Sequence, residues 1–293
     1  MGLLTTGWVV AATVCVSLAL VQFLIWLQRR QEHEYLLFSL TALAAAGVAV
    51  AEIRMSQAGS VSDFVAGFKL ANYCLAGLFV SLAWFIVVYS GTRKRLLAWI
   101  STVAWSIGAV LNIFRPLGLS LSEISGLEQE QTFWGEPYIV ATAQVDASKF
   151  LGDVGVVAVL LLAFQTALNA WRAGRRHRAV FLAAIGLFMG LALVHTSLVD
   201  LGLLASPYLI SYTFVAIVLV ISYELARQVA AAASLSERVR AEEERWRSLL
   251  EGVELLVARI RSDGTIDFAN PFFRSISGFV SGELVGRHIR CLL

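Results

Sequence analysis

The chain alternates between long apolar blocks and short polar segments. A helix needs about 20 consecutive apolar residues to cross the roughly 30 Å hydrocarbon core of a bilayer. Seven blocks approach or exceed that length; the second and last are short by about one turn, which small tilts and interfacial anchors accommodate. We therefore predict an all-α membrane protein with a seven-transmembrane helix bundle, its spans at residues 7–27, 35–52, 68–90, 96–114, 150–170, 179–199 and 208–224.

One connection between blocks is much longer than the others. Residues 115–149 carry five acidic side chains and lie between the fourth and fifth blocks. Within them, "PYIVATAQV" is rich in β-branched residues, partly alternates, and follows the turn signal Gly135-Glu136-Pro137. We predict a strand or hairpin that covers one end of the bundle. A plain solvated loop is the alternative.

After the last block, neither proline nor glycine occurs before Gly252, so we expect the seventh helix to continue as a connector helix over residues 227–252. Apolar residues recur there every seven positions, which is typical of a coiled-coil seam. The neighbouring core row contains polar residues, so the seam is weak. We expect a homodimer through this connector, against the alternative of a solvated amphipathic helix. The seam residues are Leu225, Ala232, Val239, Trp246 and Val253.

The end of the chain changes pattern again. Residues 255–261 and 265–270 are strand-like and flank the tight-turn pair Asp263-Gly264. Short helical segments broken by glycines follow. This order predicts a small α+β segment. The predicted domains are a seven-transmembrane domain at 1–226, the connector at 227–252 and the α+β segment at 253–293.

Composition agrees with a membrane protein and limits the possible partners. Apolar residues make up 58% of the chain and charged residues only 15%, whereas about a quarter of the residues in soluble domains are charged. The lipid bilayer is therefore the principal expected partner. A net charge of +2 is too small to indicate a nucleic acid partner. The three cysteines lack the spacing of a disulfide or zinc site, so no metal is expected and the cofactor stays unknown.

Arginine and lysine are unevenly distributed between the two sides of the predicted bundle. They gather in the loops after spans one, three and five and in the segment after span seven. Such residues mark the cytoplasmic side. We therefore expect the N-terminus outside the cytoplasm and the C-terminus inside it.

Polar side chains near the outer ends of the spans are the candidate site. Charges at membrane depth cost about 3 kcal/mol on insertion scales, so each is a functional candidate. We hypothesise an outward-facing pocket for a small molecule, against the alternative of interfacial ion pairs and snorkelling side chains. His195 could contact the ligand or sense pH, against the alternative of a structural histidine. The candidates are Glu52, Arg54, Asn72, Asn112, Arg115, Trp134, Glu136, His195 and Asp200.

The last fifty residues resemble the first half of a PAS domain. The matching elements, in order, are "RWRSLLEGV", "LLVARIR", the Asp263-Gly264 turn, Ala269-Asn270-Pro271, "RSISGF" and "SGELVGR". They cover about residues 243–293. The later strands and helix of a PAS domain have no counterpart, so we expect a domain that is cut short.

The apolar region is similar to the N-terminal seven-helix sensor region of bacterial sensor histidine kinases that carry PAS domains. The phrases that match include "FIVVYSGTRKRLLAWI", "LNIFRP", "WGEP", "NAWRAGRRHRAVF" and "SYELAR". The resemblance implies a sensory receptor of a two-component system in the bacterial inner membrane. It would pass an external or membrane-borne small-molecule signal through helix seven to PAS and kinase modules. The chain contains no Gly-rich ATP box, so we expect no enzyme within it.

The rival interpretation is a transporter or membrane enzyme with a vestigial PAS tail. Three observations count against it: no paired intramembrane carboxylates, no metal-ligand cluster, and no two helices broken by Gly or Pro in matching halves. All four prolines lie outside the interiors of the predicted spans.

Overall fold

The computed structural model describes most of the chain and divides it into two compact units. The described residues are 2–132, 134–200, 203–204, 206–252, 255, 257–277 and 285–292. The first unit is Met1–Leu225 and the second is Ala226–Leu293. Each unit is described separately below.

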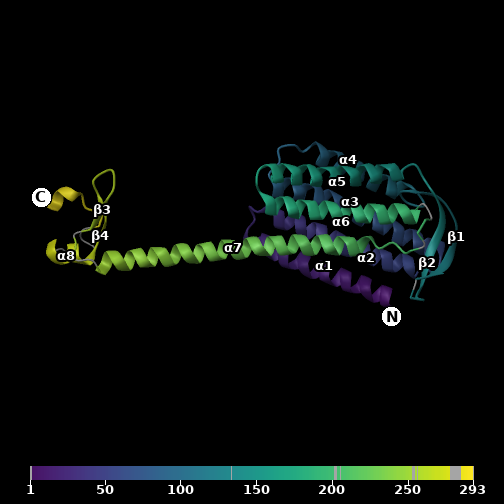
Figure 1. The fold of residues 1–293 in the computed structure, drawn as a ribbon, viewed down its shortest axis with the longest axis horizontal. Coiled ribbons are helices and arrows are strands. Elements are labelled where there is room, and N and C mark those ends of the chain that lie inside the picture. The colour runs from purple at the N-terminus through teal and green to yellow at the C-terminus, as the bar shows by residue number, and fades with distance from the viewer. Residues whose placement is uncertain are drawn as a thin grey trace. The chain divides into compact units, whose positions relative to one another are not determined.

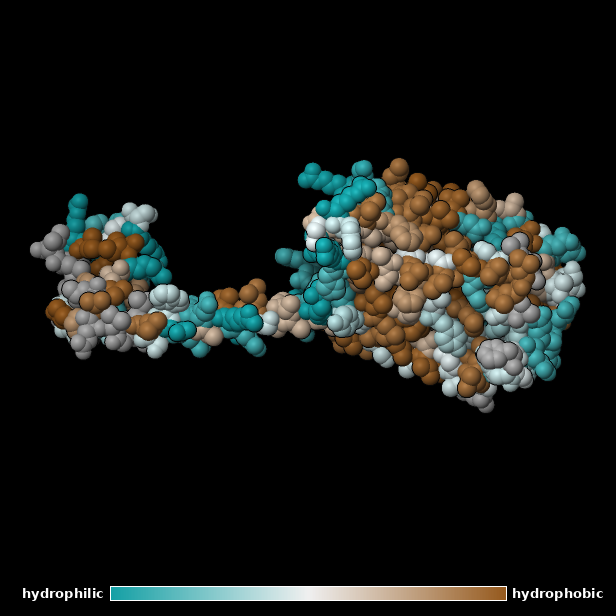
Figure 2. All heavy atoms as spheres, viewed as in Figure 1, coloured by the Kyte–Doolittle hydropathy of each residue, from teal (hydrophilic) through white to brown (hydrophobic). Residues whose placement is uncertain are grey.

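Within the described residues, seven helices are long and apolar enough to cross a bilayer. The predicted number of spans is therefore confirmed, and the chain is a multi-pass membrane protein. Large apolar side chains cover the middle of the first unit, and polar ones gather toward its two ends (Figure 2). The helices are α1 (Leu3–Gln28), α2 (His33–Ser56), α3 (Val61–Ser90), α4 (Leu96–Phe114), α5 (Lys149–Arg172), α6 (Arg176–Asp200) and α7 (Ile210–Gly252) (Figure 1).

Helix α3 begins seven residues before the predicted span at 68–90. Its start is fixed by Ser60, whose hydroxyl accepts a hydrogen bond from the Asp63 amide (3.2 Å) and donates one to the Asp63 carboxylate (2.6 Å). A serine in this position satisfies a backbone donor that the first helical turn leaves free. The first two turns are amphipathic and bury Phe64. A search for continuous apolar blocks therefore could not detect them.

The long connection forms an antiparallel hairpin of β1 (Leu121–Gln131) and β2 (Pro137–Val145), which confirms the predicted strand and its turn. Gly135 occupies the turn with φ +86°. The hairpin lies over one end of the helices (Figure 1), which we call the hairpin end. Its inner face packs on two apolar clusters, one with Met55 and Phe64 and the other with Leu4 and Trp8.

The opposite end of the first unit, which we call the basic end, carries the short connections rich in arginine. They join α1 to α2, α3 to α4 and α5 to α6. The arginines and the lysine in these connections and the adjoining helix ends are Arg29, Arg30, Arg93, Lys94, Arg95, Arg172, Arg175, Arg176 and Arg178.

Helix α7 runs without interruption to Gly252, which confirms the predicted continuation of the seventh helix. Its first part is buried against the bundle through Phe214, Ile217 and Ile221. Leu225 is also fully buried there, against its own bundle, so the prediction that it belongs to a seam between two copies of the helix is wrong. Ala232, Val239 and Trp246 are exposed, and Val253 lies outside the described residues.

The end of the chain contains the predicted strand, turn and strand, in shorter form. Strands β3 (Ala258–Ile260) and β4 (Ile266–Ala269) pair antiparallel, and helix α8 (Pro271–Ser277) and the 3₁₀ helix η1 (Ile289–Leu292) follow. Gly264 makes the turn with φ +83°.

Asn270 explains why the second strand stops where it does. Its side-chain oxygen accepts hydrogen bonds from the backbone amides of Phe273 (3.0 Å) and Val257 (3.2 Å), and its side-chain NH₂ group donates to the Leu255 carbonyl (2.9 Å). It therefore caps α8 while holding the chain before β3. Proline follows it at the first position of the helix, where no backbone donor is needed.

Candidate functional site

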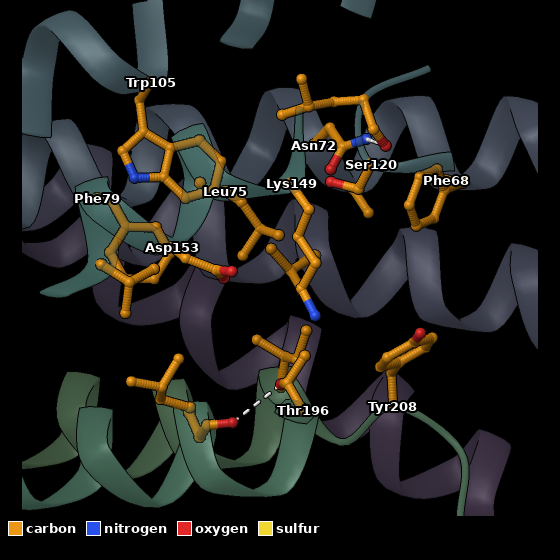
Figure 3. A pocket seen from close by; sticks show the side chains of 18 of the residues that line it. Phe68, Asn72, Leu75, Phe79, Trp105, Ser120, Lys149, Asp153, Thr196 and Tyr208 are labelled. Atoms are coloured by element: carbon orange, nitrogen blue, oxygen red, sulfur yellow. Dashed lines mark hydrogen bonds between the residues drawn. The ribbon is translucent and has the colours of Figure 1, made fainter. Parts of the chain in front are cut away.

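A cavity lies inside the hairpin end of the first unit. Its first compartment has a volume of about 160 Å³ and is lined by helices α2 to α7 and the hairpin (Figure 3). A second compartment of about 140 Å³ adjoins it beneath β2. We call the two together the hairpin-end cavity. The residues that line both compartments are Glu52, Met55, Phe68, Leu121, Val145 and Tyr208.

The walls of the first compartment are mostly apolar and include an aromatic corner, formed by Phe79, Trp105 and Phe214. The Phe79 and Trp105 rings stack with centroids 5.0 Å apart, and the Phe214 ring meets Phe79 edge-on at 5.6 Å. These three side chains come from α3, α4 and α7. Such rings offer flat faces to an apolar or cationic group.

Glu52 is the buried carboxylate of the cavity, with only 2% of the residue exposed. One carboxylate oxygen accepts a hydrogen bond from the Ser211 amide (3.2 Å), and the other accepts one from the Ser211 hydroxyl. Ser211 lies in the first turn of α7. The lining of the cavity is therefore bonded directly to the seventh helix.

Two further ionisable residues line the first compartment, Lys149 and Asp153, one turn apart on α5. Figure 3 shows both side chains pointing into the cavity. The sequence analysis did not select either of them. Asp153 also overturns one argument against a transporter, because Glu52 and Asp153 are two intramembrane carboxylates that line the same cavity.

Asn72 and Asn112 form a buried amide pair that ties the end of α4 to α3. Asn112 donates to the Lys69 carbonyl (3.1 Å) and accepts from Asn72 (3.2 Å) and from the Leu119 amide (3.0 Å). Asn72 lines the cavity, whereas Asn112 supports it from behind. Gly118 allows the chain to pass close to this pair for two reasons. Its φ is +83°, and a Cβ at this position would lie only 2.9 Å from the side-chain oxygen of Asn112.

Arg115 does not line the cavity but fixes the base of the hairpin. Its guanidinium forms an ion pair with Asp146 and donates to the Ser148 hydroxyl (3.0 Å). Hydrogen bonds from Ser148, followed by the bond from Arg115, lower the pKa of Asp146 to about 2. The arrangement is that of a structural ion pair.

Trp134 and Glu136 lie at the tip of the hairpin, outside the cavity lining. The Glu136 carboxylate accepts from the Leu4 amide (2.8 Å) and from the Trp134 indole (3.1 Å). It therefore caps the start of α1, whose own Gly2 supplies no side-chain cap. Partial desolvation opposes ionisation, but these hydrogen bonds outweigh it and lower the pKa of Glu136.

The remaining candidates lie at the margin of the cavity or away from it. His195 is half-buried on α6 with its Nε2 atom 3.5 Å from the Ser206 hydroxyl, and Ser206 lines the second compartment. Arg54 is exposed at the end of α2. Asp200 ends α6, and its side chain lies outside the described residues. Of the nine candidates, Glu52 and Asn72 therefore line the cavity itself.

A second buried carboxylate, Glu224, holds α7 at the basic end of the bundle. It is 2% exposed, accepts a hydrogen bond from the Tyr89 hydroxyl (2.9 Å) and lies 3.3 Å from His177 Nε2. Helix α7 is therefore bonded to the bundle through polar side chains at both ends of its buried part.

Among the described residues, no group of three or more His, Cys, Asp or Glu side chains is placed to hold a metal ion. No protein-family model matches the chain, and no curated protein matches it. The interpretation of the site therefore depends on its geometry.

Proposed function

We propose that the chain is the sensory part of a bacterial inner-membrane receptor, in which a small molecule in the hairpin-end cavity changes the position of α7. The observation that carries the proposal is the pair of hydrogen bonds between Glu52 and Ser211. A ligand that contacts Glu52 competes with or reinforces these bonds. It would therefore have different affinities for two positions of α7, which is the physical requirement for a signal.

The proposed orientation of the protein in the membrane is based on the distribution of its basic residues. The basic end carries the short arginine-rich loops, so it faces the cytoplasm, and the hairpin end faces outward. The cavity would then be reached from outside or from the outer leaflet. Helix α7, which begins at the hairpin end and continues to Gly252, would carry the change to the cytoplasmic side.

The segment beyond the bundle is the proposed output connection. Ala232, Val239 and Trp246 are exposed on α7 at seven-residue intervals, so two copies of the helix could pair through them. The strand, turn, strand and capped helix that follow are compatible with the start of a PAS domain. We infer that the full receptor is a homodimer that passes the signal to a PAS domain and a kinase, and we assign no reaction to this chain itself.

The proposal can be tested without knowing the ligand. Full-length chains in lipid nanodiscs would carry Val239→Cys as the single cysteine, and the rate of disulfide formation between two copies would be measured. Ser211→Ala removes the hydroxyl bond to Glu52, so we expect that rate to change by about fivefold or more, a typical coupling between distant sites.

Thr213→Ala is the matched control, because among the described residues the Thr213 hydroxyl bonds only within its own helix, to the Ile210 carbonyl (2.7 Å). Equal cross-linking rates in the Ser211 and Thr213 variants and the parent would contradict the coupling. A separate assay addresses the transporter, which the Glu52 and Asp153 carboxylates would also suit. Saturable solute uptake into liposomes that contain the chain would favour that rival.

A further inference from the structure

Among the described residues, the charged side chains that line the hairpin-end cavity are two carboxylates and one ammonium group. The Glu52 and Asp153 carboxylates face a single ammonium group, that of Lys149, so one negative charge is in excess when all three are ionised. The NH₂ group of Asn72 is already used by Asn112 and the Leu119 carbonyl, which leaves its oxygen toward a ligand. An excess charge in apolar surroundings is costly unless a partner neutralises it. The lining therefore favours a ligand with one positive charge.

The dimensions of the cavity limit the apolar body of that ligand. The two compartments measure about 160 and 140 Å³. An engineered apolar cavity of about 150 Å³ in another protein holds one benzene molecule. The first compartment therefore accepts one ring or a branched chain of similar size, beside the aromatic corner of Phe79, Trp105 and Phe214. The faces of these rings also attract a cation.

A buried donor in the second compartment has no hydrogen bond of normal geometry. Trp8 is 1% exposed, and its indole N–H is directed toward the Glu52 carboxylate without forming such a bond. A buried donor of this kind is costly when it is left unsatisfied. An oxygen on the ligand would accept this hydrogen bond. A hydroxyl group could at the same time donate to Glu52.

We propose that the hairpin-end cavity binds a small organic amine in its protonated form, with an apolar body of about one ring and a nearby hydroxyl oxygen. The ammonium would lie between Glu52 and Asp153, the ring against the aromatic corner, and the oxygen toward Trp8. This inference rests on the receptor function proposed above and names the chemical class of its ligand.

Calorimetric titration of the full chain in lipid nanodiscs at pH 7 tests the inference with three probes that share a phenyl ring and a hydroxyl group; the first two have the same number of heavy atoms, and the third is larger by two. They are 2-amino-1-phenylethanol (a cation), 1-phenylpropan-1-ol (neutral) and 3-hydroxy-3-phenylpropionate (an anion). We expect the cation to bind most tightly. Glu52→Gln should weaken it roughly 10- to 100-fold, as loss of a charged hydrogen bond does, and change the neutral probe less than threefold. Glu123→Gln, an exposed carboxylate on β1, is the control and should change neither.

A second pair of variants shows whether binding occurs in the cavity. A Cβ on Gly152 would make ordinary contact with the Trp105 ring (3.6 Å), so Gly152→Val fills space in the first compartment. Gly190→Val is its match on α6, where a Cβ meets nothing within 4 Å. We expect Gly152→Val to weaken the cation at least tenfold and Gly190→Val to leave it unchanged.

One further comparison tests whether the Trp8 indole contributes to binding of the hydroxyl oxygen. The Trp8→Phe variant should bind 2-amino-1-phenylethanol several-fold less tightly and leave 2-phenylethylamine, which lacks the oxygen, unchanged. Equal losses for both amines would overturn the role of Trp8.

The outcomes separate this inference from the receptor proposal. If the neutral or anionic probe binds more tightly than the cation and Gly152→Val abolishes its binding, the amine is overturned while the cavity remains a ligand site. If all probes bind equally to the parent and to Gly152→Val, they only partition into lipid, and both the amine and the ligand cavity are overturned. If no probe binds, the amine is overturned, and the Val239 cross-linking assay still decides the coupling.

Discussion

The contact between α1 and α7 at the hairpin end depends on the absence of a side chain at Gly7. A Cβ on Gly7 would overlap the Tyr212 hydroxyl and lie 3.0 Å from the ring carbon that bears it. The same hydroxyl donates to the Leu4 carbonyl (3.2 Å). Gly7→Ala should therefore push the start of α7 away from α1.

The size of the effect follows from two opposing contributions. Replacing a helical glycine with alanine gains about 1 kcal/mol of helix propensity, and overpacking a close contact costs about 1–3 kcal/mol. Gly7→Ala alone should therefore destabilise the chain by about 1 kcal/mol. Tyr212→Phe loses one membrane hydrogen bond, which costs about 0.6 kcal/mol. Because it also removes the overlapping oxygen, Gly7→Ala should be neutral or stabilising in the Tyr212→Phe background.

Reversible unfolding in mixed micelles, followed over increasing SDS content, provides the four free energies of this double-mutant cycle. We expect a coupling of about 1–2 kcal/mol that favours the double variant. Independent sites add within about 0.3–0.5 kcal/mol. Additivity within that range would refute the close approach of the two helices.

Three other variants and one control test the supports of the cavity. Glu136→Gln should lower the melting temperature at neutral pH by removing the charged cap of α1, worth about 1 kcal/mol. Since folding lowers the pKa of Glu136 below 4.5, this difference should be present above that pH and vanish as the pH falls through the folded-state pKa. Gly118→Ala should cost about 2–3 kcal/mol through positive φ and the clash with Asn112, whereas Gly135→Ala, with positive φ but open space, should cost about 1 kcal/mol. Asn112→Leu should destabilise by about 2–4 kcal/mol in SDS unfolding, because it leaves the Leu119 amide and Lys69 carbonyl without a partner.

The spans could be predicted because a bilayer imposes a length and a composition on each helix separately. The span at 96–114 agrees with α4 at both ends, and the hairpin followed from a turn signal and a β-branched run. The first turns of α3 were missed because Ser60 starts the helix in amphipathic sequence. Leu225 was assigned to the wrong surface because a heptad pattern continues into the part of α7 that packs on the bundle.

The site was only partly predictable, because the membrane topology gives the depth of a residue in the bilayer but not the direction in which its side chain points. Depth alone placed Glu52 and Arg115 together, yet Glu52 faces the cavity and Arg115 faces Asp146. Asp153 was overlooked near the start of an apolar block, although an acidic residue one turn after Lys149 inside a span is a detectable signal. The aromatic corner joins three helices distant in sequence, and no local pattern reports that contact.

The central claim, that occupation of the cavity moves α7, is tested most directly by a distance measurement within the bundle. Nitroxide labels at Leu219→Cys on α7 and Ile107→Cys on α4, both exposed positions, would be compared by pulsed electron paramagnetic resonance in a background without other cysteines. With saturating 2-amino-1-phenylethanol, the account predicts a shift of about 1–2 Å, typical of signalling helices, which Glu52→Gln abolishes. Identical distance distributions with and without the bound amine would contradict it.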